Sequence, residues 1–297
     1  MADQPPLLSI VICTFNRAER LGDLVGQLLA DQDCNYEILV VDDGSTDDTK
    51  AVVAAFDDPR VRYEYQVNGG LSVARNTGLR QARGELVAFV DDDDRPVATW
   101  AAQLSAPFAD DPDCAVVMCG VIDVKGDVEV TRLPLRLGPV FDDFEGLIAA
   151  GSFAVRRAAA LEAGGFDDNI RCSHQTEFML RMLPLCTARS WRVVAIPDAL
   201  LRINWAAPDA RGRNNPERLL DCTERLVDVH GDRLRRDPHA YANYAAVCGA
   251  CCARLGRYGD ARGWFARAWR SERSMRHLSR TAITLVPPVA RRVWGVS

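Results

Sequence analysis

Short apolar runs alternate with helical segments along the first 124 residues, and this alternation constrains the fold more than any other feature. The intervening residues 17–32 and 71–83 carry apolar side chains at helical spacing. Such alternation predicts an α/β fold with a mostly parallel sheet flanked by helices. The strand-like runs, rich in β-branched residues, are 7–14, 36–42, 61–66, 85–91 and 115–124.

The remainder of the chain predicts a different organisation. Residues 125–150 are rich in glycine and proline and predict an irregular connection, and 191–197 predicts a strand. Residues 205–216 predict a linker, and 241–270 predict two helices that resemble one tetratricopeptide-like pair. We therefore expect an α/β domain over 1–205 and a helical extension over 206–297.

Composition places the chain among ordinary globular proteins. Hydrophobic residues make up 48% and charged residues 26%. No run approaches the roughly 20 apolar residues of a membrane-spanning helix, and no basic leader precedes the first apolar run. These features predict a cytoplasmic protein whose ten cysteines are reduced thiols.

The charges are divided unevenly along the chain. Acidic residues outnumber basic ones before residue 200, whereas arginines outnumber acidic residues over 201–297. An acidic N-terminal part suits a divalent cation, and a basic tail suits an anionic membrane or a phosphorylated substrate. A solvated helical surface explains the tail equally well. Nucleic-acid binding is not expected, because the tail offers no aromatic stacking platform.

Acidic residues follow two of the predicted strands. Asp42 and Asp43 end one run, and Asp91–Asp94 end another. Ligands of parallel α/β sheets bind at the carboxyl ends of the strands, where these carboxylates are expected. A hard divalent cation would relieve their mutual repulsion, although a solvated acidic turn is the alternative. Arg75, on the helix after NGGLS, is placed to meet a phosphate.

Three strings in this region resemble a known family. They are SIVICTFNR, EILVVDDGSTDDT and GLSVARNTGLRQARGELVAFVDDDD, and their order and spacing over residues 7–94 are similar to family 2 glycosyltransferases with the GT-A fold. A weaker similarity continues through AAGSFAVRRAAALEAGGFDD, so that the resemblance covers roughly residues 7–205.

The resemblance implies an inverting glycosyltransferase. Residues 1–205 would be the catalytic domain, taking a sugar from a nucleotide-diphosphate donor, with UDP as the first expectation. The acceptor would be a hydroxyl of a polysaccharide, a lipid carrier or a natural product. The resemblance assigns donor binding to Thr14, Phe15, Asn16, Asp43, Arg75 and Asp92.

The metal ligands are also implied by the resemblance. Asp91 and Asp93 match the two ends of the family's D-x-D motif. Asp93 would be the main ligand of Mg²⁺ or Mn²⁺, which neutralises charge on the leaving diphosphate. Relatives often carry a histidine after the strand corresponding to 191–197, where this chain has Asn204 and Trp205. This difference predicts weaker metal dependence.

The expected catalytic base is missing from its usual position. The family places an aspartate there, and this chain has Gln175, which cannot accept a proton at neutral pH. His174 and Glu177 lie one and two residues away on the same predicted helix and are the substitutes. A third possibility is that no base exists, and that the chain binds nucleotide sugars without transferring them.

Other functions fit the sequence less well. A nucleotidyltransferase would need a glycine-rich phosphate loop, and TFNRAER lacks the glycines. A dinucleotide dehydrogenase would need GxGxxG after the first strand, which is absent. For the helical extension, a homodimer contact, a peripheral membrane contact and a lid all stay open.

Overall fold

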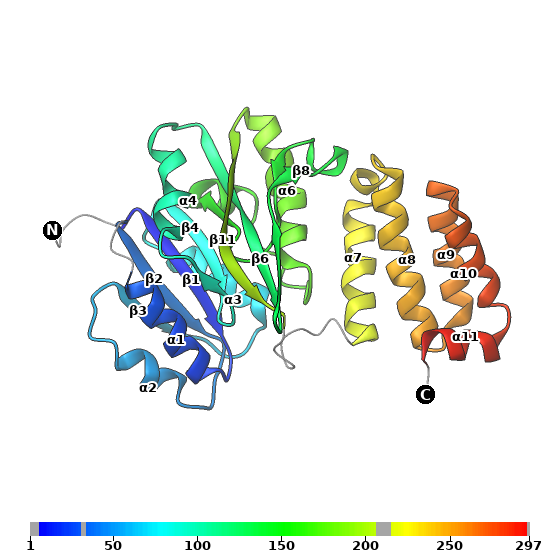
Figure 1. Ribbon diagram of the computed structural model, residues 1–297, viewed down its shortest axis with the longest axis horizontal. Coiled ribbons are helices and arrows are strands. Elements are labelled where there is room, and N and C mark those ends of the chain that lie inside the picture. The colour runs from blue at the N-terminus through cyan, green and yellow to red at the C-terminus, as the bar shows by residue number, and fades with distance from the viewer. Residues whose placement is uncertain (1–5, 31–33, 206–214, 296–297) are drawn as a thin grey trace. The chain divides into compact units, whose positions relative to one another are not determined.

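The computed structural model describes residues 6–30, 34–205 and 215–295 (Figure 1). The chain divides into two compact units. One contains the β-sheet and helices α1–α6, and the other contains helices α7–α11 together with the short segments 138–140 and 170–173. Residues 206–214 of the predicted linker lie outside the described residues.

The sheet-containing unit has strands and helices that alternate through its first half. Its strands are β1 (Leu8–Thr14), β2 (Tyr36–Asp42), β3 (Val61–Tyr65), β4 (Leu86–Asp91), β5 (Arg95–Pro96), β6 (Cys114–Lys125), β7 (Val128–Arg132), β8 (Leu135–Arg136), β9 (Glu145–Gly146), β10 (Phe153–Arg156) and β11 (Arg192–Asn204). Its helices are α1 (Ala18–Leu29), α2 (Thr49–Ala54), α3 (Leu71–Gln81), α4 (Trp100–Ala109), α5 (Arg157–Glu162) and α6 (His174–Arg189).

The main sheet has nine strands in the order β3-β2-β1-β4-β10-β6-β11-β5, with β7 paired to β6. Strands β3, β2, β1 and β4 are parallel neighbours, as the sequence predicts. Beyond β4 the sheet becomes mixed, because β10 runs antiparallel to both β4 and β6. The predicted α/β class is therefore confirmed, with a sheet that is parallel only in part.

Helices cover both faces of this sheet because successive strand residues point in opposite directions. Ile10 and Ile12 of β1 pack in one hydrophobic cluster with residues of α1, α2 and α4. Val11 lies between them in sequence and packs in the other cluster, with α3, α5 and α6. The strands read as nearly continuous apolar runs because both of their faces are buried.

Residues 125–150 are more regular than the sequence predicts. Strand β7 returns along β6 from a tight turn at Gly126, whose φ of 60° suits glycine, and β8 pairs with β9 in a separate small sheet. The prediction of an irregular connection was wrong over these strands. Four of the five residues of β7 are exposed, so the segment lacks the continuous apolar sequence of a strand that is buried on both faces.

The second unit is helical, as predicted. Helix α7 begins after Asn215, and α8 begins after Asp237; each of these residues caps its helix by accepting hydrogen bonds from backbone N–H groups. No helix in the described ranges combines the length and apolarity needed to cross a membrane. The helices are α7 (Pro216–Leu234), α8 (Pro238–Arg254), α9 (Tyr258–Glu272), α10 (Met275–Ile283) and α11 (Pro287–Trp294).

Candidate functional site

The carboxyl ends of β1, β2 and β4 meet at one edge of the sheet. The parallel register pairs Thr14 of β1 with Asp42 of β2, and Cys13 with Asp91 of β4. The residues that follow these strands are therefore brought side by side, although they come from three separate stretches of sequence. This edge holds every aspartate that the sequence singles out.

The four consecutive aspartates that end and follow β4 point in different directions. Asp91, Asp93 and Asp94 each offer a carboxylate oxygen, and these oxygens lie within 4.8 Å of one another. Asp92 faces β1 and α1 instead, where it accepts hydrogen bonds from Thr14 Oγ1 at 3.0 Å and Arg17 Nη1 at 2.6 Å. Burial raises the pKa of the Asp92 carboxyl, whereas its hydrogen bonds and the charge of Arg17 oppose the rise.

The three clustered carboxylates suit a hard divalent cation. Oxygen atoms are the ligands that Mg²⁺ and Mn²⁺ prefer, and the cluster sits at the end of a buried strand. The sequence singles out Asp91 and Asp93 as ligands and passes over Asp94. No pattern in the sequence distinguishes Asp94 from Asp92, because the turn after β4 decides which side chains converge.

Asp43 organises the loop that leads into α3. Its Oδ1 accepts hydrogen bonds from Gln66 Nε2 at 2.6 Å and from the backbone N–H of Gly69 at 2.8 Å, and its Oδ2 accepts from Gly70 N–H at 2.8 Å. A carboxylate has about four acceptor positions, so one more hydrogen bond is available. Asp43 is thus fixed at the edge next to the aspartate cluster while keeping capacity for a ligand.

The loop after β1 lies beside the loop after β2. Asn16 adopts a left-handed backbone conformation, with a φ of 54°, and its Oδ1 accepts a hydrogen bond from Thr46 N–H at 2.7 Å. Its own N–H donates to Ser45 Oγ at 2.8 Å. Phe15 is 46% exposed at the same place. An exposed aromatic ring in a fixed loop offers a flat surface for a nucleoside base.

Arg75 is buried beneath the aspartates rather than exposed on α3. Its Nη2 donates to Asp91 Oδ1 at 2.7 Å, and its guanidinium lies 5.4 Å from the centre of the Phe166 ring. With its carboxamide oxygen facing the arginine, Gln175 accepts from Nη2 at 2.9 Å and from Nη1 at 3.2 Å. Arg75 therefore joins the end of β4 to the start of α6.

Gln175, at the usual position of the catalytic base, and its two possible substitutes occupy different environments. Gln175 lies at the site, bonded to Arg75, but it is a neutral amide. Glu177 is buried and binds Arg181 with both oxygens, at 2.8 Å and 2.6 Å. Arg181 in turn donates to the carbonyl of Gly165 at 2.6 Å, so the pair holds α6 against the turn after α5. His174 is buried at the first position of α6.

Two residues that hold the site together were not identified from the sequence. Arg17 holds Asp92, and Asn76 holds the turn before α6 through hydrogen bonds to the backbone of Phe166 and to Asp168 Oδ1. Arg17 stands in the TFNR string, three residues after Thr14, and this spacing after the strand is the signal that could have found it.

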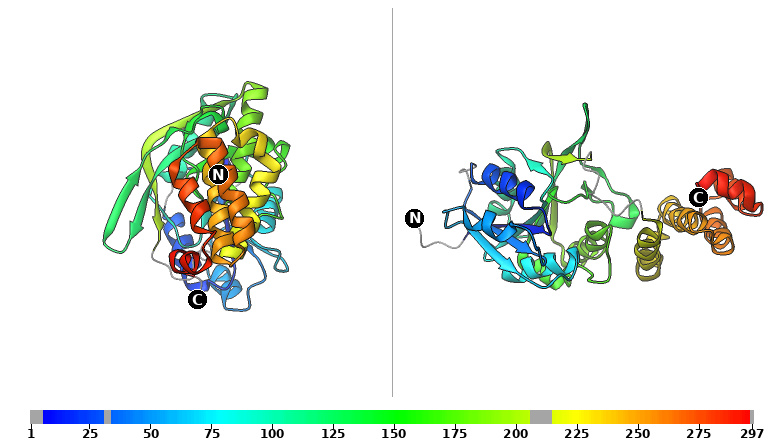
Figure 2. Two further views of the ribbon diagram at one scale, coloured as in Figure 1. Left: turned by 90° about the vertical axis from the view of Figure 1, so that its right-hand side faces the viewer. Right: turned by 90° about the horizontal axis from the view of Figure 1, so that it is seen from below.

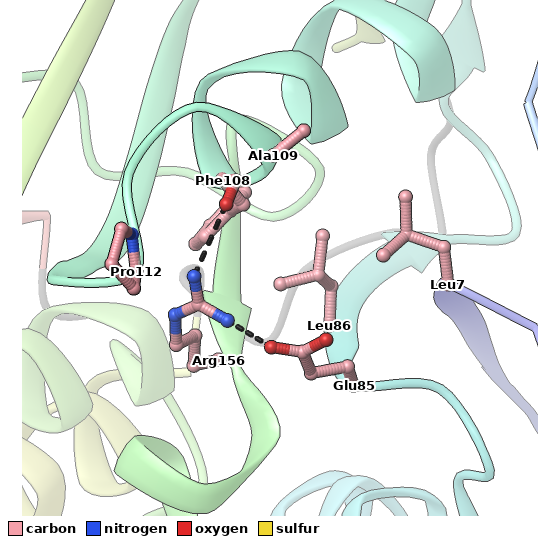
Figure 3. Close-up of a pocket in the computed structure, with 7 residues that line it drawn as sticks. All are labelled: Leu7, Glu85, Leu86, Phe108, Ala109, Pro112 and Arg156. Atoms are coloured by element: carbon pink, nitrogen blue, oxygen red, sulfur yellow. Dashed lines mark hydrogen bonds and ion pairs between the residues drawn. The ribbon is translucent and has the colours of Figure 1, made fainter.

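A pocket at the opposite edge of the sheet has fewer polar groups available for a ligand (Figure 3). It is lined by Leu7, Leu86 and Phe108 among others, near the amino ends of β1 and β4. Figure 3 shows Arg156 reaching Glu85 and the Phe108 carbonyl, and its Nε donates to the Cys114 carbonyl at 2.7 Å. The arginine holds α4 and β4 together, so we assign this pocket no ligand.

Comparison with known proteins identifies the family of the sheet-containing unit. The profile of the family described as Glycosyl transferase family 2 matches residues 9–165, which is more than half of the chain. The chain belongs to glycosyl transferase family 2. The family match includes Thr14, Asp43, Arg75 and the aspartate cluster, and it ends before α6. The resemblance seen in the sequence is confirmed.

A curated relative agrees with this assignment. The uncharacterized glycosyltransferase EpsJ of Bacillus subtilis (strain 168) is 34% identical over 124 residues, which cover 41% of this chain and 36% of EpsJ. The chain thus matches about a third of the length of that curated relative.

Two solved structures share the fold. The S. aureus TarS 1–349 structure in complex with UDP-GlcNAc has a TM-score of 0.62 at 18% identity, covering 97% of this chain and 88% of TarS 1–349. Mannosyltransferase PcManGT from Pyrobaculum calidifontis, in complex with GDP-Man and Mn²⁺, has a TM-score of 0.57 at 18% identity. The match covers 99% of this chain and 89% of PcManGT. The fold expected from the family is confirmed.

Proposed function

We propose that the chain transfers a sugar from a nucleotide-diphosphate sugar to an acceptor hydroxyl, with inversion at the anomeric carbon. The observation that carries the proposal is the convergence of Asp91, Asp93 and Asp94 beside Asp43 at the carboxyl edge of a family 2 domain. A nucleotide and a diphosphate need hydrogen-bond acceptors and a cation within reach of each other, and this edge supplies both.

In this proposal, different residues at the carboxyl edge of the sheet bind different parts of the donor. Asp43, Phe15 and Asn16 bind the nucleoside, because they lie together on the loops after β1 and β2. Asp92, fixed by Thr14 and Arg17, lies next to the ribose. Arg75 acts mainly by orienting Asp91, since its guanidinium is buried and already bonded to that carboxylate.

A divalent cation, Mg²⁺ or Mn²⁺, would be held by Asp91 and Asp93 with Asp94 beside them. When bound there it would stabilise the negative charge on the departing nucleoside diphosphate. UDP is the proposed nucleotide, and GDP is the first alternative, because TarS was solved with UDP-GlcNAc and PcManGT with GDP-Man. The acceptor is an open part of the proposal.

Calorimetry with UDP, GDP and dTDP in the presence of Mn²⁺ tests the donor site. We expect one nucleotide to bind, and we expect Asp93→Ala to weaken that binding at least tenfold. Asp110→Ala removes an exposed aspartate at the end of α4 and should leave the affinity unchanged. If no nucleotide releases heat with the wild-type chain, or if both variants bind equally well, the proposed donor site is wrong.

For the proton acceptor we propose His174. The hydroxyl of the acceptor must lose a proton as it attacks, and neutral histidine can accept one near pH 7. Glu177 suits the role less well, because both of its oxygens bind Arg181. His174→Ala should abolish release of UDP from UDP-glucose or UDP-N-acetylglucosamine, and His239→Ala, an exposed histidine on α8, should not.

A second candidate function is nucleotide-sugar binding without transfer. The observation that favours it is the neutral Gln175 hydrogen-bonded to Arg75, where the family has a carboxylate. Under this alternative, the wild-type chain binds donor but releases no UDP, and His174→Ala changes nothing.

The variant Gln175→Asp separates the two candidates. If the chain is a binding protein, Gln175→Asp should create donor turnover in a protein that had none. If the chain is a transferase that relies on His174, the wild type should already turn over donor, and Gln175→Asp should restore the rate lost in His174→Ala. A matched Gln175→Glu variant keeps the side-chain length and shows whether the position of the carboxylate matters.

A further inference from the structure

Helix α10 has an inverted distribution of polar and apolar side chains. His277 is 3% exposed and Thr284, just after the helix, is fully buried, whereas Met275 is 72% exposed and Leu278 is 41% exposed. His277 Nε2 lies 3.0 Å from Glu272 Oε2, so a polar ring and its carboxylate partner occupy the buried side of the helix. Met275, Leu278 and Ala282 are spaced at i, i+3 and i+7, so the exposed side forms one stripe.

The exposed apolar stripe continues into α11. Leu285, Val286 and Val289 are 65%, 49% and 45% exposed, and the two prolines between them are exposed as well. Val286, Val289 and Val293 are spaced at i, i+3 and i+7, and Val293 is 54% exposed. A run of consecutive exposed apolar residues is unfavourable in water unless something covers it.

The same segment is strongly basic. Residues 273–297 contain no aspartate or glutamate. Arg273, Arg276, Arg291 and Arg292 are exposed, and they lie in the same stretch of sequence as the apolar residues just described. The arginines of the segment are Arg273, Arg276, Arg280, Arg291 and Arg292.

We propose that this surface binds the face of an anionic lipid bilayer. The α10–α11 surface comprises Met275, Leu278, Leu285, Val286, Val289 and Val293 with Arg276, Arg291 and Arg292. Apolar side chains of such a surface enter the boundary between headgroups and acyl chains, while arginines pair with lipid phosphates. Figures 1 and 2 draw α10 and α11 at the red, C-terminal end of the colour scale. Both features lie on exposed residues of these helices and of the turn between them.

Charge argues against a second copy of the chain as the occupant. A twofold contact would place the same surface of each subunit against its equal, and the exposed arginines of one copy would face those of the other. Repulsion between like charges would then oppose the burial of the apolar side chains. An anionic lipid surface accommodates both the charge and the apolar area.

Co-sedimentation of the full chain with lipid vesicles tests the proposal. We expect binding to vesicles of phosphatidylcholine mixed with phosphatidylglycerol, and little binding to phosphatidylcholine alone. Leu285→Asp and Val289→Asp should each weaken binding at least tenfold, because each places a charge in the apolar boundary. The control Val229→Asp makes the same change at an exposed valine of α7 and should bind like the wild type.

A second pair of variants tests the electrostatic part. Changing both Arg291 and Arg292 to glutamine should weaken binding to anionic vesicles about thirtyfold, because each basic residue near the membrane surface raises the affinity roughly fivefold. The matched pair Arg80→Gln with Arg83→Gln removes two exposed arginines from the other unit and should have little effect.

Several outcomes would overturn the proposal. One is failure of the wild-type chain to sediment with anionic vesicles. Another is equal binding by Val289→Asp and Val229→Asp. A third is a wild-type dimer in light scattering that Val289→Asp converts to a monomer while vesicles bind neither protein. None of these results depends on nucleotide binding, so a failure of the membrane proposal would leave the proposed transferase function untouched.

Discussion

The buried ion pair between Glu177 and Arg181 fixes α6 next to the candidate site. We predict that Glu177→Ala lowers the free energy of unfolding by about 3 kcal/mol, because it leaves a partly buried arginine without its partner. Glu177→Gln keeps one acceptor and should cost about 1 kcal/mol. Urea denaturation measures both. The control Glu162→Ala breaks an exposed pair with Arg189 and should cost less than about 0.5 kcal/mol.

The same variants decide between a structural and a catalytic role for this glutamate. If Glu177→Gln leaves stability unchanged but abolishes UDP release from a UDP-sugar, Glu177 is the base and His174 is not. If it lowers stability and leaves turnover in place, the pair only positions α6.

The sequence shows the run of four aspartates but not which of them converge. A run of four aspartates after a strand is visible in the sequence, but Asp92 turns towards Thr14 while Asp94 turns towards Asp91. Backbone geometry at the end of β4 determines these directions, and this geometry cannot be derived from the residue types alone. The contact between Arg75 and Gln175 joins residues far apart in sequence, so only the fold reveals it.

At the scale of the elements, Glu37 links several of them at the amino edge of the sheet. Its Oε1 accepts from Ser9 Oγ and from the Arg83 N–H, both at 2.6 Å, and its Oε2 accepts from Arg62 at 2.7 Å. Burial acts to raise the pKa of the Glu37 carboxyl, but these hydrogen bonds outweigh burial and lower it below its ordinary value of 4.5. The charged form therefore favours the folded state.

This shift predicts how stability depends on pH. The unfolded chain binds a proton at Glu37 before the folded chain does as pH falls, so the stabilisation is complete above pH 4.5 and is lost below it. We predict that Glu37→Gln lowers the free energy of unfolding by about 1–3 kcal/mol at pH 7 and flattens its decline below pH 4.5.

Urea denaturation across this pH range measures the effect. Glu145→Gln changes an exposed glutamate of β9 and should leave the profile unchanged. A Glu37→Gln profile parallel to that of the wild type would show that Glu37 does not control acid sensitivity.

Elements are predictable from the sequence where both faces of a strand are buried. Runs such as β1, β2 and β4 are continuously apolar, and their parallel pairing follows from the helices between them. Strand β10 has only four residues before α5 begins, and it enters the sheet between strands distant from it in sequence. Its pairing depends on tertiary contacts, which a local pattern does not contain.

At the scale of the whole molecule, we propose that the two units unfold separately. The helical unit has its own packing: Phe265 of α9 is fully buried, and a Cβ on Gly249 of α8 would lie 2.7 Å from its ring. That ring also stacks on Trp294 of α11, with centroids 5.8 Å apart. Replacing Phe265 removes contacts that join three helices of this unit.

We predict that Phe265→Ala destabilises the helical unit by about 3–5 kcal/mol and leaves the sheet-containing unit intact. Calorimetry should show one of two transitions moving to lower temperature, with nucleotide affinity unchanged. Phe89→Ala, in the core beneath the aspartate edge, should move the other transition instead. If either variant moves both transitions together, the units unfold as one, because cooperativity then passes between the sheet and the helices.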